Sequence, residues 1–178
     1  MPHVHGFDRW PTIEAHLPRE GGTALDIGAN AGLFSFALAR SGYTVTAVER
    51  SEKEAYVLRR LVAASELPIR VIKSSIFDAP LGDHYRVVLA LNIFHHFLKT
   101  EPTLHRLERL LRDLATDHVF FESHDPEEVQ MRGAFFNPAP QEFAAWVAER
   151  VGLDVVRLIG QPEDRSLFLL TSRDGAAA

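Results

Sequence analysis

The stretch Ala24-Leu-Asp-Ile-Gly-Ala-Asn-Ala-Gly-Leu-Phe-Ser-Phe-Ala-Leu-Ala39 decides the fold of this chain. It opens with a short, largely apolar run, residues 24–27, which is typical of a strand buried on both faces of a parallel sheet. It closes with a pattern that predicts a helix. The apolar stripe of that helix consists of Leu33, Phe36, Ala37 and Leu38. Together the parts predict a strand, a tight turn and a helix.

Two glycines and an asparagine shape the predicted turn, Asp26-x-Gly28-x-Asn30-x-Gly32. Gly28 permits a backbone conformation that a side chain would block, and it lets the chain approach a ligand closely. Asparagine, the residue type at position 30, tolerates a left-handed conformation better than any other residue type except glycine. Gly32 lets the helix start close to the strand. We expect the first turn of this helix to point unpaired N–H groups at a ligand above it.

The spacing of these residues separates two kinds of cofactor site. A dinucleotide site needs Gly-x-Gly-x-x-Gly, because a pyrophosphate has to lie on the helix N-terminus, and this chain lacks that spacing. The segment resembles instead the first motif of class I S-adenosylmethionine-dependent methyltransferases, an acidic residue followed by Gly-x-x-x-Gly. The resemblance implies that Gly28, Asn30 and Gly32 hold the methionine part of S-adenosylmethionine, with Asp26 near its amino group. An ordinary strand–turn–helix unit of another α/β protein is the alternative.

A second acidic residue follows the next predicted strand. Residues 43–48 have a strand pattern that ends at Glu49, about 20 residues beyond the glycine turn. In doubly wound sheets an acidic residue at this point commonly binds ribose hydroxyls, because a carboxylate can accept from both. The methyltransferase family shares this feature, so the resemblance assigns Glu49 to the ribose of the cofactor. A solvent-exposed strand end is the alternative.

A third predicted strand, residues 69–72, leads into Ser74-Ser-Ile-Phe-Asp78. The resemblance implies that Asp78 accepts a hydrogen bond from the adenine amino group, with Ile76 or Phe77 beside the ring. Aspartate is also a common turn former before a proline such as Pro80, which is the structural alternative.

The fourth predicted strand, residues 85–91, is apolar on both faces and ends in Asn92-Ile-Phe-His-His-Phe97. Ligands of open α/β sheets bind beyond the carboxyl ends of the strands where the strand order reverses. We therefore expect residues 28–32 and 92–97 to face each other across the cofactor, with Asn92 among the residues that bind it. The segment looks like the post-fourth-strand motif of many small class I methyltransferases. It differs from Asn/Asp-Pro-Pro-Tyr/Phe, which is typical of amino methylation on adenine or glutamine.

His95 and His96 have two interpretations. An imidazole can shape the loop by bonding a backbone carbonyl, or it can orient or deprotonate an attacking hydroxyl, because histidine titrates near neutral pH. We take both as the candidate catalytic residues. We predict no metal site, because adjacent histidines point in different directions and the nearest carboxylate, Glu101, is several residues away.

The rest of the chain completes a recognisable order of elements. Residues 154–159 and 166–171 predict two strands whose short link implies an antiparallel hairpin. A doubly wound, mostly parallel seven-stranded α/β sheet with such a C-terminal hairpin is the plan of the Rossmann-like methyltransferase fold. The other predicted elements are a helix at 52–65, a helix at 103–114, a strand at 118–122 and a helix at 141–151. The predicted inward face of the helix at 52–65 consists of Ala55, Leu58, Leu61 and Val62.

We expect three parts in the chain. Residues 23–172 form the methyltransferase domain, 1–22 form an N-terminal arm that packs on the domain edge or serves as a lid, and 173–178 form a disordered tail. The irregular segment between the fifth strand and the last helix is the natural place for substrate recognition, because loops at strand ends carry specificity. Its polar candidates are Glu122, His124 and Arg132.

Composition narrows the class of protein and of substrate. The 178 residues are enough for one domain, and the absence of cysteine excludes disulfides and thiol nucleophiles. No long apolar run and no signal peptide are visible, so we expect a cytoplasmic transferase without membrane contact. The net charge of −5 and the lack of a basic stripe favour a small-molecule acceptor. An RNA or protein acceptor is the alternative, and so is a catalytically inactive methyltransferase-like binding subunit. His3 and His5 are taken as solvated terminal residues.

Overall fold

The structure is a computed structural model that describes residues 7–162 and 165–173. Seven strands form one sheet in the order β3-β2-β1-β4-β5-β7-β6. The strands are β1 (Gly22–Ile27), β2 (Tyr43–Glu49), β3 (Ile69–Lys73), β4 (Tyr85–Leu91), β5 (Thr116–Glu122), β6 (Val155–Gly160) and β7 (Leu167–Thr171). The helices are α1 (Trp10–Glu14), α2 (Leu33–Arg40), α3 (Glu52–Ala63), α4 (Glu101–Asp113) and α5 (Pro140–Val151), with short 3-10 turns η1 (Phe7–Arg9), η2 (Ile76–Asp78), η3 (Phe94–Phe97) and η4 (Val129–Met131).

The sheet has the predicted plan. β2 runs parallel to both β1 and β3, and β1 runs parallel to β4. β7 runs antiparallel to β5 and to β6, so the predicted C-terminal hairpin is confirmed. The chain divides into two compact units, unit 1 (Met1–Leu89) and unit 2 (Ala90–Ala178).

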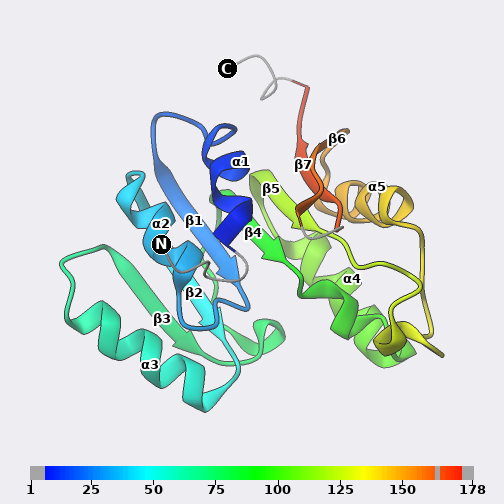
Figure 1. The fold of residues 1–178 in the computed structure, drawn as a ribbon, viewed down its shortest axis with the longest axis horizontal. Coiled ribbons are helices and arrows are strands. Elements are labelled where there is room, and N and C mark those ends of the chain that lie inside the picture. The colour runs from blue at the N-terminus through cyan, green and yellow to red at the C-terminus, as the bar shows by residue number, and fades with distance from the viewer. Residues whose placement is uncertain (1–6, 163–164, 174–178) are drawn as a thin grey trace. The chain divides into compact units, whose positions relative to one another are not determined.

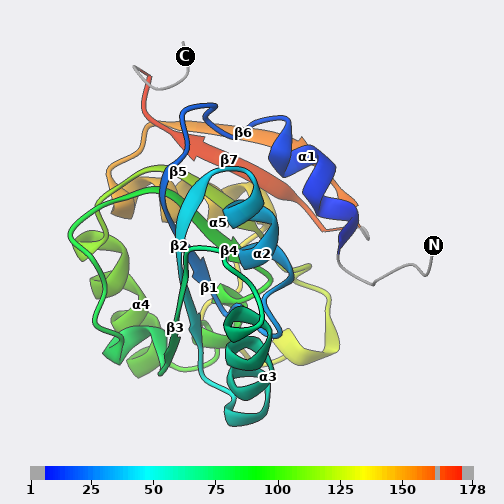
Figure 2. The same cartoon turned by 90° about the vertical axis from the view of Figure 1, so that its left-hand side faces the viewer.

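Unit 1 is built on parallel strands whose side chains are buried on both faces. Ala24, Leu25 and Ile27 of β1 are buried, as are Val87 and Val88 of β4, which explains the near-continuous apolar sequence of both strands. In Figure 1, β1, β2 and β3 lie side by side with α2 and α3 next to them. Figure 2 shows α1, α2 and α3 on one side of these strands.

The helices α2 and α3 form as predicted, but the prediction that Leu33 and Leu61 lie on their buried faces is wrong. Leu33 is 36% exposed and Leu61 is 48% exposed. Leu61 turns outward because the buried side of α3 is set by Ala55 and Leu58, and at 100° per residue Leu61 lies about 120° around the axis from Ala55. The buried face of α2 consists of small residues and one leucine, namely Ser35, Ala37, Leu38 and Ala39.

The N-terminal arm packs on unit 1. Trp10 and Ile13 are buried, and the ring of Trp10 lies 6.5 Å from that of Phe34 on α2. The hydroxyl of Tyr43 donates a hydrogen bond to the backbone oxygen of Pro18 at 2.7 Å. These contacts give the arm a place on the domain edge, and its role as a lid stays a prediction.

Unit 2 has an aromatic core between β5, β7 and α5. Phe121 of β5 stacks on Phe168 of β7 and meets the ring of Phe143 on α5 edge-on. The helices α4 and α5 are joined by an ion pair between Arg150 and Glu108 at 2.9 Å, and Figure 1 shows α5 beside β6 and β7. A well-packed hairpin and helix therefore support the loops that follow β4 and β5.

Some predictions fall outside the described residues, namely those on His3, His5 and the tail beyond Arg173. Within residues 7–162 and 165–173, no helix has the length and apolar character needed to span a bilayer.

Candidate functional site

The turn after β1 has the backbone that its residues predict. Gly28 has a φ of 75°, Asn30 of 50° and Gly32 of 90°, all in the left-handed region. A Cβ added at Gly32 would lie 2.2 Å from Cδ1 of Leu58 on α3. Two features therefore require glycine at position 32: its positive φ, and the close approach of α3, which leaves no room for a Cβ.

The amides of the turn itself, residues 28–32, are bonded within the protein, and the predicted N–H groups in the first turn of α2, which begins at Leu33, stay a prediction. The amides of Gly28 and Ala29 both donate to the backbone oxygen of Val48, and the amide of Gly32 donates to that of Ala29. The Asn30 amide donates to the Glu49 carboxylate at 2.8 Å, and the Ala31 amide donates to the Asn30 side chain at 2.6 Å. Five consecutive donors are thus used within the protein, so this turn does not offer them to a phosphate group.

Glu49 lies at the end of β2, as predicted, and its carboxylate is fixed by two backbone amides. Oε2 accepts from the Asn30 amide at 2.8 Å and Oε1 accepts from the Ser51 amide at 2.6 Å. The side chain is half-buried. Each carboxylate oxygen can accept more than one hydrogen bond, so Glu49 is oriented by the protein and still able to bind two hydroxyl donors.

Asp26 lies inside unit 1 and turns toward α2. It is 5% exposed, and the hydroxyl of Ser35 donates a hydrogen bond of 2.6 Å to its Oδ2. Burial raises the pKa of Asp26 to about 6, against the lowering effect of the Ser35 bond and with a further rise from the charge of Glu49. A carboxylate in such surroundings is stabilised by a cationic partner.

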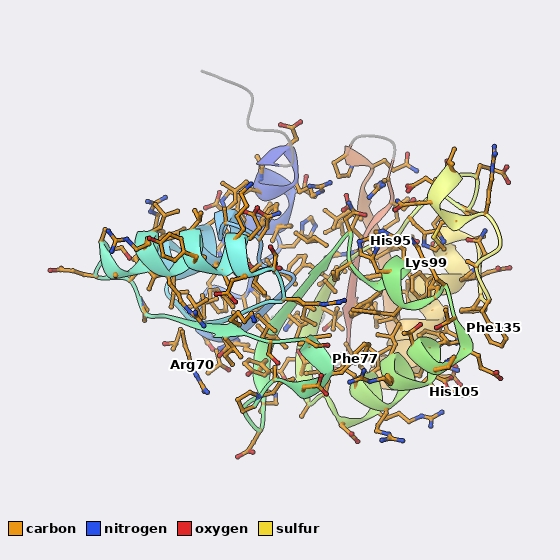
Figure 3. All side chains as sticks on the ribbon, turned by 90° about the horizontal axis from the view of Figure 1, so that it is seen from below. Arg70, Phe77, His95, Lys99, His105 and Phe135 are labelled. Atoms are coloured by element: carbon orange, nitrogen blue, oxygen red, sulfur yellow. The ribbon has the colours of Figure 1, made fainter. Side chains whose placement is uncertain are left out.

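The third strand brings residues 74–78 beside Glu49. Glu49 pairs with Lys73 across β2 and β3, and the Ser74 amide donates to the backbone oxygen of Glu49 at 3.1 Å. Ile76 is buried, Phe77 is half-buried, and Asp78 is exposed at the end of η2. Figure 3 labels Phe77 on this turn. The predicted role of these three residues beside the adenine stays a prediction.

In unit 2 the segment after β4 forms the short turn η3. Asn92 has a left-handed φ of 52°, and His95 and His96 follow with their rings 3.9 Å apart. His95 is buried, whereas His96 is exposed. Burial lowers the pKa of His95 to about 4, helped by the charges of His96, Arg165 and His124. Figure 3 shows His95 and Lys99 on this segment.

His124 lies beside His95 in unit 2. Its ring centroid is 6.2 Å from that of His95, and it is 1% exposed. Arg165 forms an ion pair of 2.8 Å with Glu128, and its charge lowers the pKa of His95, His96 and His124 alike. The structure thus places His95 between His96 and His124, which the sequence had marked only as a polar candidate for substrate recognition.

The residues that sequence reasoning missed are Asn137, Glu128 and Arg165. The hairpin contained a signal for Arg165, because β7 pairs with β5 and the Ser123 amide donates to the backbone oxygen of Ser166 at 3.0 Å. That pairing places Arg165, which precedes Ser166, next to His124, which follows Ser123. Whether residues 92–97 face the glycine turn of unit 1, as the sequence predicts, stays a prediction.

Several buried polar atoms of unit 2 have no hydrogen-bond partner among the described residues. They are Oδ1 of Asn92, Nε2 of His95, Nδ1 of His124 and Nη1 of Arg165. Within the described part of the chain, no group of three or more histidine, aspartate or glutamate side chains is arranged to hold a metal ion.

The family model for the methyltransferase domain matches residues 25–115, about half of the chain. The chain is 28% identical over 130 residues to a cypemycin N-terminal methyltransferase from Streptomyces, covering 72% of this chain and 51% of that protein. It is 33% identical over 100 residues to a ubiquinone biosynthesis O-methyltransferase from Caulobacter vibrioides, covering 55% of this chain and 40% of that protein. The chain thus spans about half or less of the length of these relatives.

Solved structures have the same fold. Monomeric WbdD matches with a TM-score of 0.70 and 25% identity, over 84% of this chain and 36% of that one. Magnesium protoporphyrin IX methyltransferase from Synechocystis, solved with bound SAM, matches with a TM-score of 0.63 and 17% identity, over 92% of this chain and 74% of that one.

The family match covers the glycine turn, Glu49 and the segment after β4, and the strand order agrees with the structural neighbours. This chain therefore belongs to the class I S-adenosylmethionine-dependent methyltransferase family.

Proposed function

We propose that this protein is a methyltransferase that moves the methyl group of S-adenosylmethionine to an oxygen or nitrogen nucleophile on a small molecule. The observation that carries the proposal is the pair of carboxylates, Asp26 and Glu49, at the ends of β1 and β2. They flank a turn whose backbone donors are already bonded within the protein. Such a site suits hydroxyl donors and a positive charge.

The residues of unit 1 divide between the parts of the cofactor. Glu49 accepts the two ribose hydroxyls, and Asp26 lies near the cationic amino group, directly or through water. The glycine turn supports the methionine part. The remaining predicted cofactor contacts are Ile76 and Phe77 beside the adenine ring, Asp78 at its amino group, and Asn92 from unit 2.

The cofactor supplies a methyl group that its sulfonium already activates, so holding the nucleophile in line provides much of the rate. In this proposal His95 or His96 orients or deprotonates the nucleophile. His95 is neutral at pH 7, because its pKa is lowered to about 4. It is therefore free to accept a hydrogen bond there, although its low pKa makes it a weak base.

A small-molecule acceptor is favoured by two observations. The sequence is acidic overall, with a net charge of −5, and two of the relatives are named for ubiquinone biosynthesis and O-methylation. A peptide acceptor is the second candidate, because another relative is named as an N-terminal methyltransferase of cypemycin.

Calorimetry and a transfer assay test the proposal in sequence. We expect S-adenosylmethionine and its demethylated product to bind the protein, and NAD and FAD not to bind. Incubation with methyl-labelled cofactor and a lysate divided into small-molecule, RNA and protein fractions then identifies the acceptor class. If the cofactor binds but no fraction receives the labelled methyl group, the protein is a cofactor-binding subunit without transferase activity. If NAD binds more tightly than S-adenosylmethionine, the proposed site is contradicted.

A further inference from the structure

One buried imidazole in unit 2 has its tautomer set by the loop around it. The Nδ2 atom of Asn137 donates a hydrogen bond of 3.0 Å to the backbone oxygen of Pro126. A carbonyl oxygen can only accept, so this contact fixes which end of the amide is nitrogen. The amide oxygen of Asn137 then faces Nε2 of His124 at 2.9 Å. His124 must therefore donate from Nε2, which leaves a lone pair on Nδ1 in the neutral ring.

The ring of His124 is neutral at pH 7. Burial lowers its pKa, and the charge of Arg165 lowers it further, against the opposing effects of the Asn137 bond, Glu128 and Asp125. His95, the other imidazole beside it, is also neutral. The Nδ1 lone pair of His124 is therefore not blocked by a proton in the neutral pH range.

That lone pair lacks a donor. Nδ1 of His124 is buried and has no hydrogen-bond partner among residues 7–162 and 165–173, and the same is true of Nε2 of His95. The edge-to-face packing of Phe143 against the His124 ring, at 5.6 Å between centroids, holds the ring in place. A buried acceptor without a partner destabilises the folded protein, and such groups in native proteins usually mark a bound water or a functional role.

We propose that Nδ1 of His124 accepts a hydrogen bond from a hydroxyl group of the methyl acceptor, and that Asn137 is the positioning residue that aims this lone pair. The inference rests on the proposed function and deepens it by naming the acceptor class, a compound with a neutral O–H group. A carboxylate or an ether has no proton to donate and would set two lone pairs against each other. A cationic amine is disfavoured by the guanidinium of Arg165, whose charge acts on His124 and His95.

Side-chain ¹⁵N spectra of the full chain test the tautomer without any need for turnover. We expect His124 in the Nε2–H form in the wild type, and a mixture with the Nδ1–H form in Asn137→Ala. Asn137→Asp restores the Nε2–H form, because a carboxylate also accepts from Nε2. Asn137 is exposed, so its variants should fold. An Nδ1–H form in the wild type, or an unchanged spectrum in Asn137→Ala, would overturn the proposal.

Phenol and anisole then serve as matched probes, because they share a ring and differ in the O–H group. We expect phenol to move the Nδ1 resonance of His124 and anisole to leave it in place, with the exposed His105 (Figure 3) unchanged as an internal control. Asn137→Ala should weaken the phenol response about fivefold, which is the value of one hydrogen bond. Equal responses to phenol and anisole, or no response because a buried water already binds Nδ1, would overturn the inference.

Calorimetry with S-adenosylmethionine separates this inference from the proposed function. If the wild-type protein does not bind S-adenosylmethionine, the proposed function is contradicted, whatever the histidine spectra show. Normal cofactor binding together with a negative phenol result would contradict only the role of His124.

Discussion

Replacing Asp26 with asparagine separates the two consequences of a buried carboxylate, lower stability and a place for a cation. Asp26→Asn keeps the shape and keeps an oxygen that can accept from Ser35, but it removes the charge. The pKa of Asp26 rises from 3.8 to about 6 on folding, and each unit of pKa corresponds to about 1.4 kcal/mol. The ionised side chain therefore costs about 3 kcal/mol of folding free energy at pH 7.5.

The sign of the pH dependence follows from proton binding. Between pH 4 and 6 the folded protein holds a proton on Asp26 that the unfolded chain releases, so this group makes the protein more stable as the pH falls through 6. Asp26→Asn should gain up to about 3 kcal/mol at pH 7.5 and almost nothing near pH 4. Urea unfolding at pH 7.5, 6 and 4.5 measures the difference, and Asp83→Asn, the same change at an exposed position, is the matched control.

The same variant should lose affinity for the cofactor, because the amino group of S-adenosylmethionine no longer meets a negative charge. We expect a loss of about tenfold by calorimetry at pH 7.5, corresponding to about 1.4 kcal/mol. A variant that is no more stable than the wild type at pH 7.5 would refute the buried-charge reasoning. A more stable variant with unchanged affinity would refute only the contact between Asp26 and the cofactor.

Further changes test other parts of the site. Glu49→Ala should weaken binding of S-adenosylmethionine at least tenfold, since two hydroxyl contacts of about 1 kcal/mol each are lost; unchanged affinity in calorimetry would contradict the ribose assignment. Gly32→Ala should destabilise the protein by about 2–5 kcal/mol in urea unfolding, through its positive φ and the clash with Leu58, and adding Leu58→Ala should remove the clash but not the strain. His95→Gln should reduce the loss of stability between pH 6.5 and 4 by about 3 kcal/mol, because the pKa of His95 is lowered to about 4. Activity that survives at full rate in the double variant His95→Ala/His96→Ala would remove both residues as catalysts.

The sequence by itself determined the features that depend on local chemistry. Gly28, Asn30 and Gly32 adopt positive φ because few other residue types do so at low cost. Glu49 lies at the end of β2 because a strand of alternating and apolar residues runs up to it. The antiparallel hairpin followed from the short link between the last two strands.

Only the tertiary structure decided how polar groups were paired, because their partners come from distant parts of the chain. The amides of Gly28, Ala29 and Asn30 are bonded to Val48 and Glu49, about 20 residues away. The exposure of Leu61 depends on which side of α3 meets its neighbours, and helical periodicity alone leaves that side open.

The histidine cluster of unit 2 is the clearest case. The pairing of β5 with β7 brings Arg165 to His124, and the loop after β5 folds back so that Asn137 meets the same ring. Tautomer and pKa depend on burial and on neighbouring charges, which exist only after the strands have paired. Residue type therefore supplied the chemistry of these side chains, and the packed structure decided which nitrogen carries the proton.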